Sequence, residues 1–163
     1  MSPDAPTARS IAAAVRAGDR SALEVLDEHL ERVALRESDV HAFNHLIEAA
    51  ARERAAALDR VVADGGDPGP LAGVPTMVKD LFHGQAGLPC GNGSRLSEGW
   101  QVAHSTQIYA RTVAAGMTSV GRTTTSEFGI MGTTETLAQG ATRSPWSVDH
   151  MAGGSSGGAG AVV

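Results

Sequence analysis

The chain has 163 residues, of which 42% are hydrophobic, and its 13 Lys and Arg against 18 Asp and Glu give a formal net charge of −5. This length and apolar content suit a single domain with a core of its own. The acidic balance and the lack of a basic run argue against binding to nucleic acid or an anionic membrane surface, and no segment stays apolar for the ~18 residues of a membrane span.

Three helices are predicted in the first 66 residues, over residues 9–17, 21–36 and 48–63. The first stops before Gly18, a residue type that ends helices because it tolerates positive φ. The second begins at Ser21 to Glu24, which has the form of a capping box, and continues with apolar residues at helical spacing. Residues 39–44 break the pattern before the alanine-rich third helix. The start of the chain is therefore expected to be helical.

From Leu71 onward the pattern changes to alternating strands and helices. A strand is predicted to end near Lys79, with Val74, Thr76 and Val78 on its apolar face. A helix over residues 101–116 and a strand over 117–120 should follow, and the buried side of this helix should carry Val102, Ile108, Tyr109, Thr112 and Val113. Alternating elements favour an α/β fold. We expect residues 1–163 to be one domain portion, helical over 1–66 and α/β over 67–163.

Lys79 is the first candidate for a chemical role. A lysine at a strand end is usually solvated, because its ammonium group is costly to bury without partners. Here Lys79 should point away from the apolar face, beside Met77, while Asp80 points the other way. A partly desolvated lysine without a carboxylate partner has a lowered pKa, which suits a base near neutral pH.

The second candidate is the Gly/Ser segment over residues 153–160. By composition it could be a flexible linker, a phosphate-binding loop, a G-x-S-x-G nucleophile elbow or a glycine-rich turn that opens a helix. A phosphate loop should carry a Gly-Lys-Ser/Thr ending, which is missing. The acid and histidine of a nucleophile elbow should follow its serine, and the chain ends at Val163.

Several motifs occur together in one order. They are Pro70 to Pro75, Lys79-Asp80, Gly121 to Thr123 with Glu127 to Gly129, Gly140 to Trp146, and Gly153 to Gly158. In this order and spacing the chain resembles the amidase signature family along essentially its whole length. It departs from the usual pattern at Ser144, where asparagine is common, and at Met151-Ala152. Neither difference touches a catalytic group.

The resemblance implies a Ser, cis-Ser, Lys triad. Lys79 matches the family lysine, and Ser155 matches the bridging serine, whose bond to Gly154 is cis in the family. Neutral Lys79 would take a proton through Ser155 from a nucleophilic serine, which attacks the amide carbonyl. In the family pattern this serine and its oxyanion hole lie beyond Val163. The resemblance therefore implies an amino-terminal portion of the amidase signature fold, a mixed β-sheet covered by helices, that is inactive alone.

The resemblance also implies that Gly129, Ile130 and Met131 line a substrate pocket, although apolar loop residues more often belong to a core. Ser156 is expected to cap or brace its turn, Trp100 and Trp146 to pack, and Cys90 to be structural or incidental. The histidines show no ligand spacing, so no metal is expected, and no cofactor is implied. With one cysteine and no secretory signal, a cytoplasmic location is expected.

Three functions remain open. The first is a hydrolase of linear or cyclic carboxylic amides, to which Glu135 to Trp146 looks closest. The second is the glutamine-hydrolysing component of an amidotransferase, which needs partner subunits. The third is a non-catalytic fragment. The expected partner is a small amide substrate, and a homo-oligomer or association through an unfinished sheet is also expected.

Overall fold

The computed structural model of the protein describes residues 6–82 and 84–163. Its helices are α1 (Ala8–Ala17), α2 (Ala22–Val40), α3 (Glu48–Ala63), α4 (Gln107–Ala114) and α5 (Gly157–Val162), with short 3-10 helices at Arg95–Ser97 and Glu127–Gly129. Its strands are β1 (Phe43–Leu46), β2 (Pro75–Lys79), β3 (Thr118–Thr123), β4 (Glu135–Thr136), β5 (Gly140–Ala141), β6 (Arg143–Ser144) and β7 (Ser147–Met151). After α3, strand β2, helix α4 and strand β3 alternate, and the short strands β4 to β7 precede α5, so the fold is mixed α/β as predicted.

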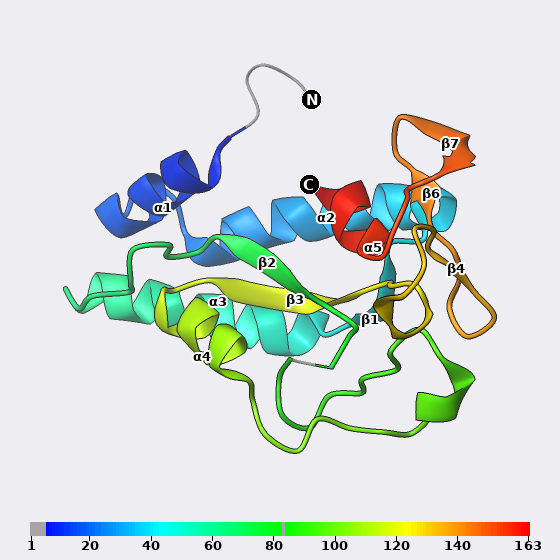
Figure 1. The fold of residues 1–163 in the computed structure, drawn as a ribbon. Coiled ribbons are helices and arrows are strands. Elements are labelled where there is room, and N and C mark those ends of the chain that lie inside the picture. The colour runs from blue at the N-terminus through cyan, green and yellow to red at the C-terminus, as the bar shows by residue number, and fades with distance from the viewer. Residues whose placement is uncertain (1–5, 83) are drawn as a thin grey trace. The chain divides into compact units, whose positions relative to one another are not determined.

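Strands β1, β3 and β2 form a three-stranded sheet in that order (Figure 1). Strand β1 is antiparallel to β3, with Leu46 opposite Gly121. Gly121 is required there because a Cβ at this position would overlap the carbonyl oxygen of His45. Two small antiparallel pairs, β4 with β5 and β6 with β7, complete the strands. The sheet carries the functional groups at the ends of its strands.

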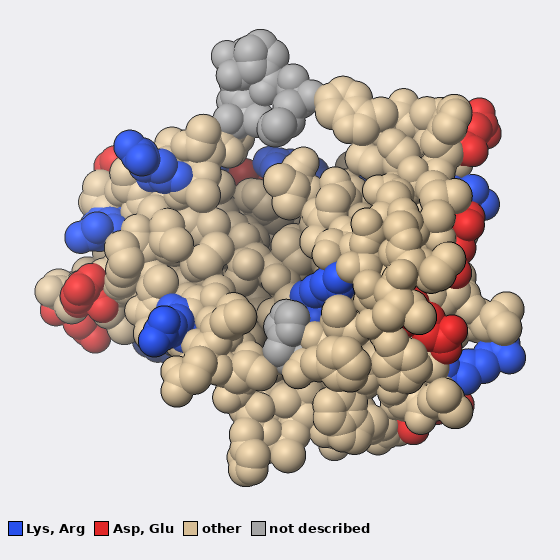
Figure 2. Space-filling model, viewed as in Figure 1, with Lys and Arg blue, Asp and Glu red and all other residues tan. Residues whose placement is uncertain are grey.

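The chain divides into two compact units. The first comprises residues 1–32, 47–76 and 111–120 and contains α1, α3 and the start of α2. The second comprises residues 33–46, 77–110 and 121–163. No helix among the described residues is long and apolar enough to cross a membrane. Acidic and basic side chains are scattered over the face in Figure 2 and form no continuous patch of one sign.

Local signals explain the helices of the first unit. Gly18 ends α1 with φ of 76°, as predicted. The capping box before α2 is formed, since the Ser21 N–H donates to Glu24 and the Glu24 N–H donates to the Ser21 hydroxyl. In addition, the Asp59 carboxylate on α3 accepts the N–H groups of Ala22 and Leu23 at 2.6 and 3.2 Å. One side chain of α3 therefore holds the first turn of α2.

After α2 begins, one predicted helix boundary was wrong and one strand was not predicted. Helix α2 runs to Val40 rather than Arg36, and its exit is held by the Glu37 carboxylate, which accepts the N–H groups of Ala42 and Phe43. The chain then forms β1, a strand that was not predicted. Its pairing partner β3 is distant in the sequence, so no local pattern marks it.

The fourth helix is shorter than predicted. It begins at Gln107 rather than residue 101, because the backbone of Val102 pairs with Gly87 and Leu88 at 2.8 and 3.0 Å. Ile108, which was predicted to be buried, is 69% exposed. The predicted apolar face of the Lys79 strand is not marked by burial either, since every residue of β2 is half-buried.

Candidate active site

Lys79 and Ser155 meet in the structure. Lys79 is the last residue of β2, and its Nζ donates a hydrogen bond to Ser155 Oγ at 2.7 Å, although the two residues are 76 positions apart. Desolvation lowers the pKa of Lys79 below its ordinary value of 10.5. Within the described residues Lys79 has no ion-pair partner. Lys79 is therefore placed to exchange a proton with the hydroxyl of Ser155.

The Gly/Ser segment is a tightly packed turn that opens a helix. The Gly154–Ser155 peptide bond is cis, as the resemblance led us to expect. Gly157 and Gly158 are buried at the start of α5, so the flexible-linker interpretation is wrong. A Cβ on Gly158 would overlap the carbonyl oxygen of Ala42 and lie 2.6 Å from the backbone nitrogen of Thr124. Ser156 occupies the N-cap position, but its side chain makes no capping hydrogen bond, contrary to that part of the prediction.

The carbonyl oxygen of Ser155 is held by the loop after β3. The Thr125 hydroxyl donates to it at 2.9 Å, and the Ser126 N–H donates to it at 3.2 Å. The Thr125 N–H in turn donates to Gln139 Oε1 at 3.1 Å. The Gln139 side-chain amide then donates to the carboxylate of Asp80 at 2.6 Å. These bonds connect Ser155 back to the residue next to Lys79.

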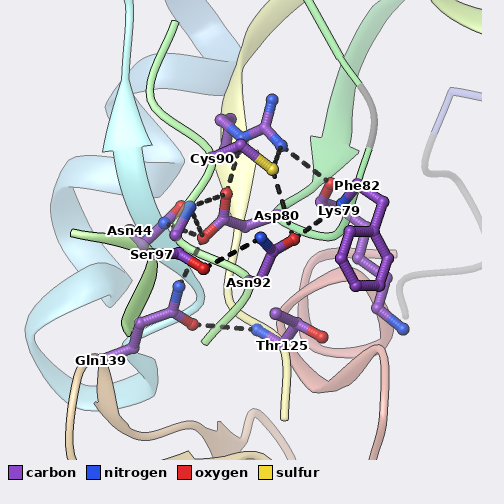
Figure 3. A network of polar contacts seen from close by, with 11 residues as sticks. Asn44, Lys79, Asp80, Phe82, Cys90, Asn92, Ser97, Thr125 and Gln139 are labelled. Atoms are coloured by element: carbon purple, nitrogen blue, oxygen red, sulfur yellow. Dashed lines mark hydrogen bonds and ion pairs between the residues drawn. The ribbon is translucent and has the colours of Figure 1, made fainter. Parts of the chain in front are cut away.

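Asp80 is the centre of a buried polar network (Figure 3). Its carboxylate is fully buried and forms an ion pair with Arg122 on β3 at 2.8 Å. Asn44 on β1 donates to it at 2.6 Å, and the Gly91 N–H donates at 3.0 Å. With Gln139, four separate segments of the chain donate to this one carboxylate. Because a buried carboxylate needs such donors, Asp80 fixes these segments beside the strand end that carries Lys79.

Cys90 belongs to the same network and is structural, as predicted. Its side chain is fully buried, and the Arg122 guanidinium donates to its sulfur at 3.0 Å. Burial raises the pKa of the Cys90 thiol, so the thiol stays protonated.

The three residues expected to bind substrate lie on one loop. Gly129 ends the 3-10 helix at Glu127–Gly129, and Ile130 and Met131 follow it with exposures of 78% and 57%. The alternative that these two side chains belong to the core is therefore wrong. The loop is joined to the Ser155 segment at its far end, where the Gly157 N–H donates to the Thr134 hydroxyl at 3.1 Å. Substrate binding by Gly129, Ile130 and Met131 stays a prediction.

The two tryptophans are exposed, and the structure also bears on metal binding. Trp100 and Trp146 were expected to pack, but they are 47% and 82% exposed. Among the described residues, no three His, Cys, Asp or Glu side chains gather as a metal site would require.

Sequence reasoning missed the residues that position the site. These are Asn44, Arg122, Thr125 and Gln139. Arg122 lies two residues beyond the predicted strand over 117–120, but β3 runs to Thr123, so its charged side chain is buried and needs a counter-ion. The other three are ordinary polar residues whose role depends on what the fold brings next to them.

Comparison with known proteins shows the family of the chain. Residues 24–163 match the family model described as Amidase, so the chain belongs to the amidase family. It is 39% identical over 157 residues to a glutamyl-tRNA(Gln) amidotransferase component from Thermobifida fusca, covering 96% of this chain and 31% of that protein. The chain thus spans about a third of the length of the curated relatives that it matches.

Solved structures of amidases have the same fold over this region. A bacterial aryl acylamidase of the amidase signature family superposes with a TM-score of 0.90 at 32% identity, covering 97% of this chain and 33% of that one. A 6-aminohexanoate cyclic dimer hydrolase superposes with a TM-score of 0.83 at 34% identity, covering 97% of this chain and 31% of that one. The family is shared by amidases and amidotransferase components, so whether residues 135–146 favour one of them stays a prediction.

Proposed function

We propose that Lys79 and Ser155 are the base and the proton-relay serine of an enzyme that hydrolyses carboxylic amides. The observation that carries the proposal is the 2.7 Å hydrogen bond from Lys79 Nζ to Ser155 Oγ, combined with the lowered pKa of Lys79. A lysine that loses its proton more readily than usual can draw a proton through the hydroxyl that it contacts.

The proposed reaction has two stages. In the first, a nucleophilic serine loses its proton through Ser155 to neutral Lys79, its oxygen bonds to the amide carbon, the C–N bond breaks, and the proton leaves with the amine. In the second, the oxygen of a water molecule bonds to the acyl carbon, the serine ester C–O bond breaks, and a proton of the water returns to the serine oxygen as the acid leaves. The family pattern places the nucleophile further along than Val163, so the activity is proposed for the complete product of the gene.

The experiment measures turnover of a panel of simple amides by the complete gene product. Lys79→Ala and Ser155→Ala should each lower kcat by about a thousandfold, because each breaks the proton path to the nucleophile. Ser156→Ala is the matched control, since Ser156 is adjacent and exposed and its side chain makes no capping bond. Equal and mild effects at both serines, or near wild-type turnover by Lys79→Ala, would contradict the assignment.

A second function is favoured by the relatives. The 39% identity to an amidotransferase component leads us to consider that the ammonia released from an amide is passed to another protein of a complex. In that case glutamine is the amide that is hydrolysed, and partner subunits are needed. Purification of the complete product with and without partners separates the two functions.

A further inference from the structure

Three residues near the site have a strained backbone. Phe82, Asn92 and Phe128 have φ of 52°, 51° and 47°, which non-glycine residues rarely adopt. Such conformations are unfavourable and cluster where function requires them. The three are also joined: the Phe82 N–H donates to Asn92 Oδ1 at 2.8 Å, and the Phe128 N–H donates to the Asn92 carbonyl oxygen at 2.8 Å. One buried asparagine therefore fixes two strained phenylalanines.

The two phenylalanine rings form a stacked pair. Their centroids are 6.3 Å apart and their planes are inclined by 23°. Phe128 is half-buried, but Phe82 is 61% exposed. Core packing explains Phe128, whereas it does not explain why a large apolar ring is held in a strained conformation at the surface.

The two phenylalanines belong to the same segments as the residues of the proposed proton path. Phe82 follows Lys79 by three residues, and Phe128 follows Ser126, whose N–H binds the Ser155 carbonyl oxygen. The two segments also touch, since a Cβ on Gly129 would lie 2.7 Å from the Leu81 side chain. Figure 3 shows the Lys79 side chain and the Phe82 ring extending to the same side, away from the Asp80 network.

We propose that Phe82, supported by Phe128, is an aromatic wall that binds an aryl group next to the scissile amide bond. This inference rests on the proposed function of Lys79 and Ser155. Two aromatic rings that stack gain attraction beyond the area that they bury, because the charge distributions of their π-systems are complementary. A short alkyl group has no such gain. The site should therefore prefer aryl amides to small aliphatic amides.

The experiment compares kcat/KM of the complete gene product for an aryl amide, such as an anilide, and for an aliphatic amide of the same acid. Wild-type protein should prefer the aryl amide, and Phe82→Ala should lower the ratio of the two kcat/KM values by about tenfold. Phe82→Tyr, which keeps the ring, should restore most of the ratio. Trp146→Ala is the control, because Trp146 is also aromatic and is 82% exposed, and this variant should leave the ratio unchanged.

Three outcomes are decisive. Turnover of neither amide by the wild-type protein would refute the proposed function, and the aromatic wall with it. Turnover of both amides with an unchanged ratio in Phe82→Ala would refute the wall alone. An equal loss for both amides, together with a lower unfolding midpoint, would show that Phe82 only stabilises the fold.

Discussion

Neighbouring residues at the end of β2 have opposite environments, and this contrast creates the site. Asp80 enters a network in which its charge is matched by Arg122 and by amide donors. The Lys79 ammonium group instead donates a hydrogen bond to the hydroxyl of Ser155 and loses part of its solvation. Adjacent residues of a strand point to opposite sides. Lys79 therefore does not form an ion pair with Asp80, although the two are neighbours in the sequence. An acidic partner would raise the pKa of the lysine instead.

The lowered pKa of Lys79 predicts a pH dependence. Since neutral Lys79 is the proposed base, kcat/KM for amides should rise with pH, with a midpoint below 10.5. Stability should change in the same direction. The unfolded chain holds the Lys79 proton more tightly than the folded protein, so the free energy of unfolding should rise as the pH increases from the folded pKa to 10.5.

Rate profiles and urea unfolding across this pH window check both effects. Lys79→Met should remove the contribution to stability in this window, because methionine does not titrate. A rate midpoint at or above 10.5 would show that Lys79 is not the base that the structure suggests.

At the scale of elements, the short helix α5 places Ser155 through its two buried glycines. Gly157 and Gly158 let the helix approach Thr134 and Thr124 more closely than any larger residue permits. Gly160, further along the same helix, has open space around it. The glycines of this segment therefore have different roles although they look alike in the sequence.

This difference can be tested by alanine substitution. Gly158→Ala should destabilise the protein by about 1–3 kcal/mol or more, because its Cβ meets backbone atoms that cannot move aside. It should also lower amide turnover, since Ser155 lies three residues earlier. Gly160→Ala should stabilise slightly, by up to about 1 kcal/mol, because alanine favours helix. Urea unfolding midpoints measure both, and equal effects would show that the packing around Gly158 is not rigid.

At the scale of the whole molecule, the residues of the candidate site all belong to the second compact unit. Lys79, Ser155 and the Asp80 network come from segments that are interrupted in sequence by parts of the first unit. The chain matches 31% of its amidotransferase relative and a similar share of several amidases, so the larger part of those proteins has no counterpart among these residues.

We predict that the complete gene product hydrolyses amides without partner subunits. The proton path and the aromatic pair are both supplied by one chain, and a hydrophobic wall suits an aryl amide better than the polar side chain of glutamine. Tagged protein purified from its own host should show turnover of simple amides and a mass, by light scattering, that contains this chain alone. Stoichiometric co-purification of other subunits with activity on glutamine only would establish the amidotransferase function instead.

Local signals in the sequence were sufficient for the three helices of the first 66 residues, apart from the end of the second. The cap at Gly18, the capping box at Ser21 and the alanine-rich helix over Glu48–Ala63 depend on neighbours within a few residues. Lys79 and Ser155 were found because their motifs occur in a familiar order. The helix signals are contained in short segments, whereas the two candidates were identified from the order of motifs along the chain.

Only the tertiary structure decided how the site is held. Strand β1 depends on its pairing with the distant β3, and the late start of α4 depends on the pairing of Val102 with Gly87 and Leu88. The joining of Asn44, Arg122 and Gln139 to Asp80 depends on residues separated by 36 to 59 positions. The sequence marks these residues as polar but does not say which polar groups will be buried together. Folding decides this, because a buried carboxylate must be matched by whichever donors the chain brings to it.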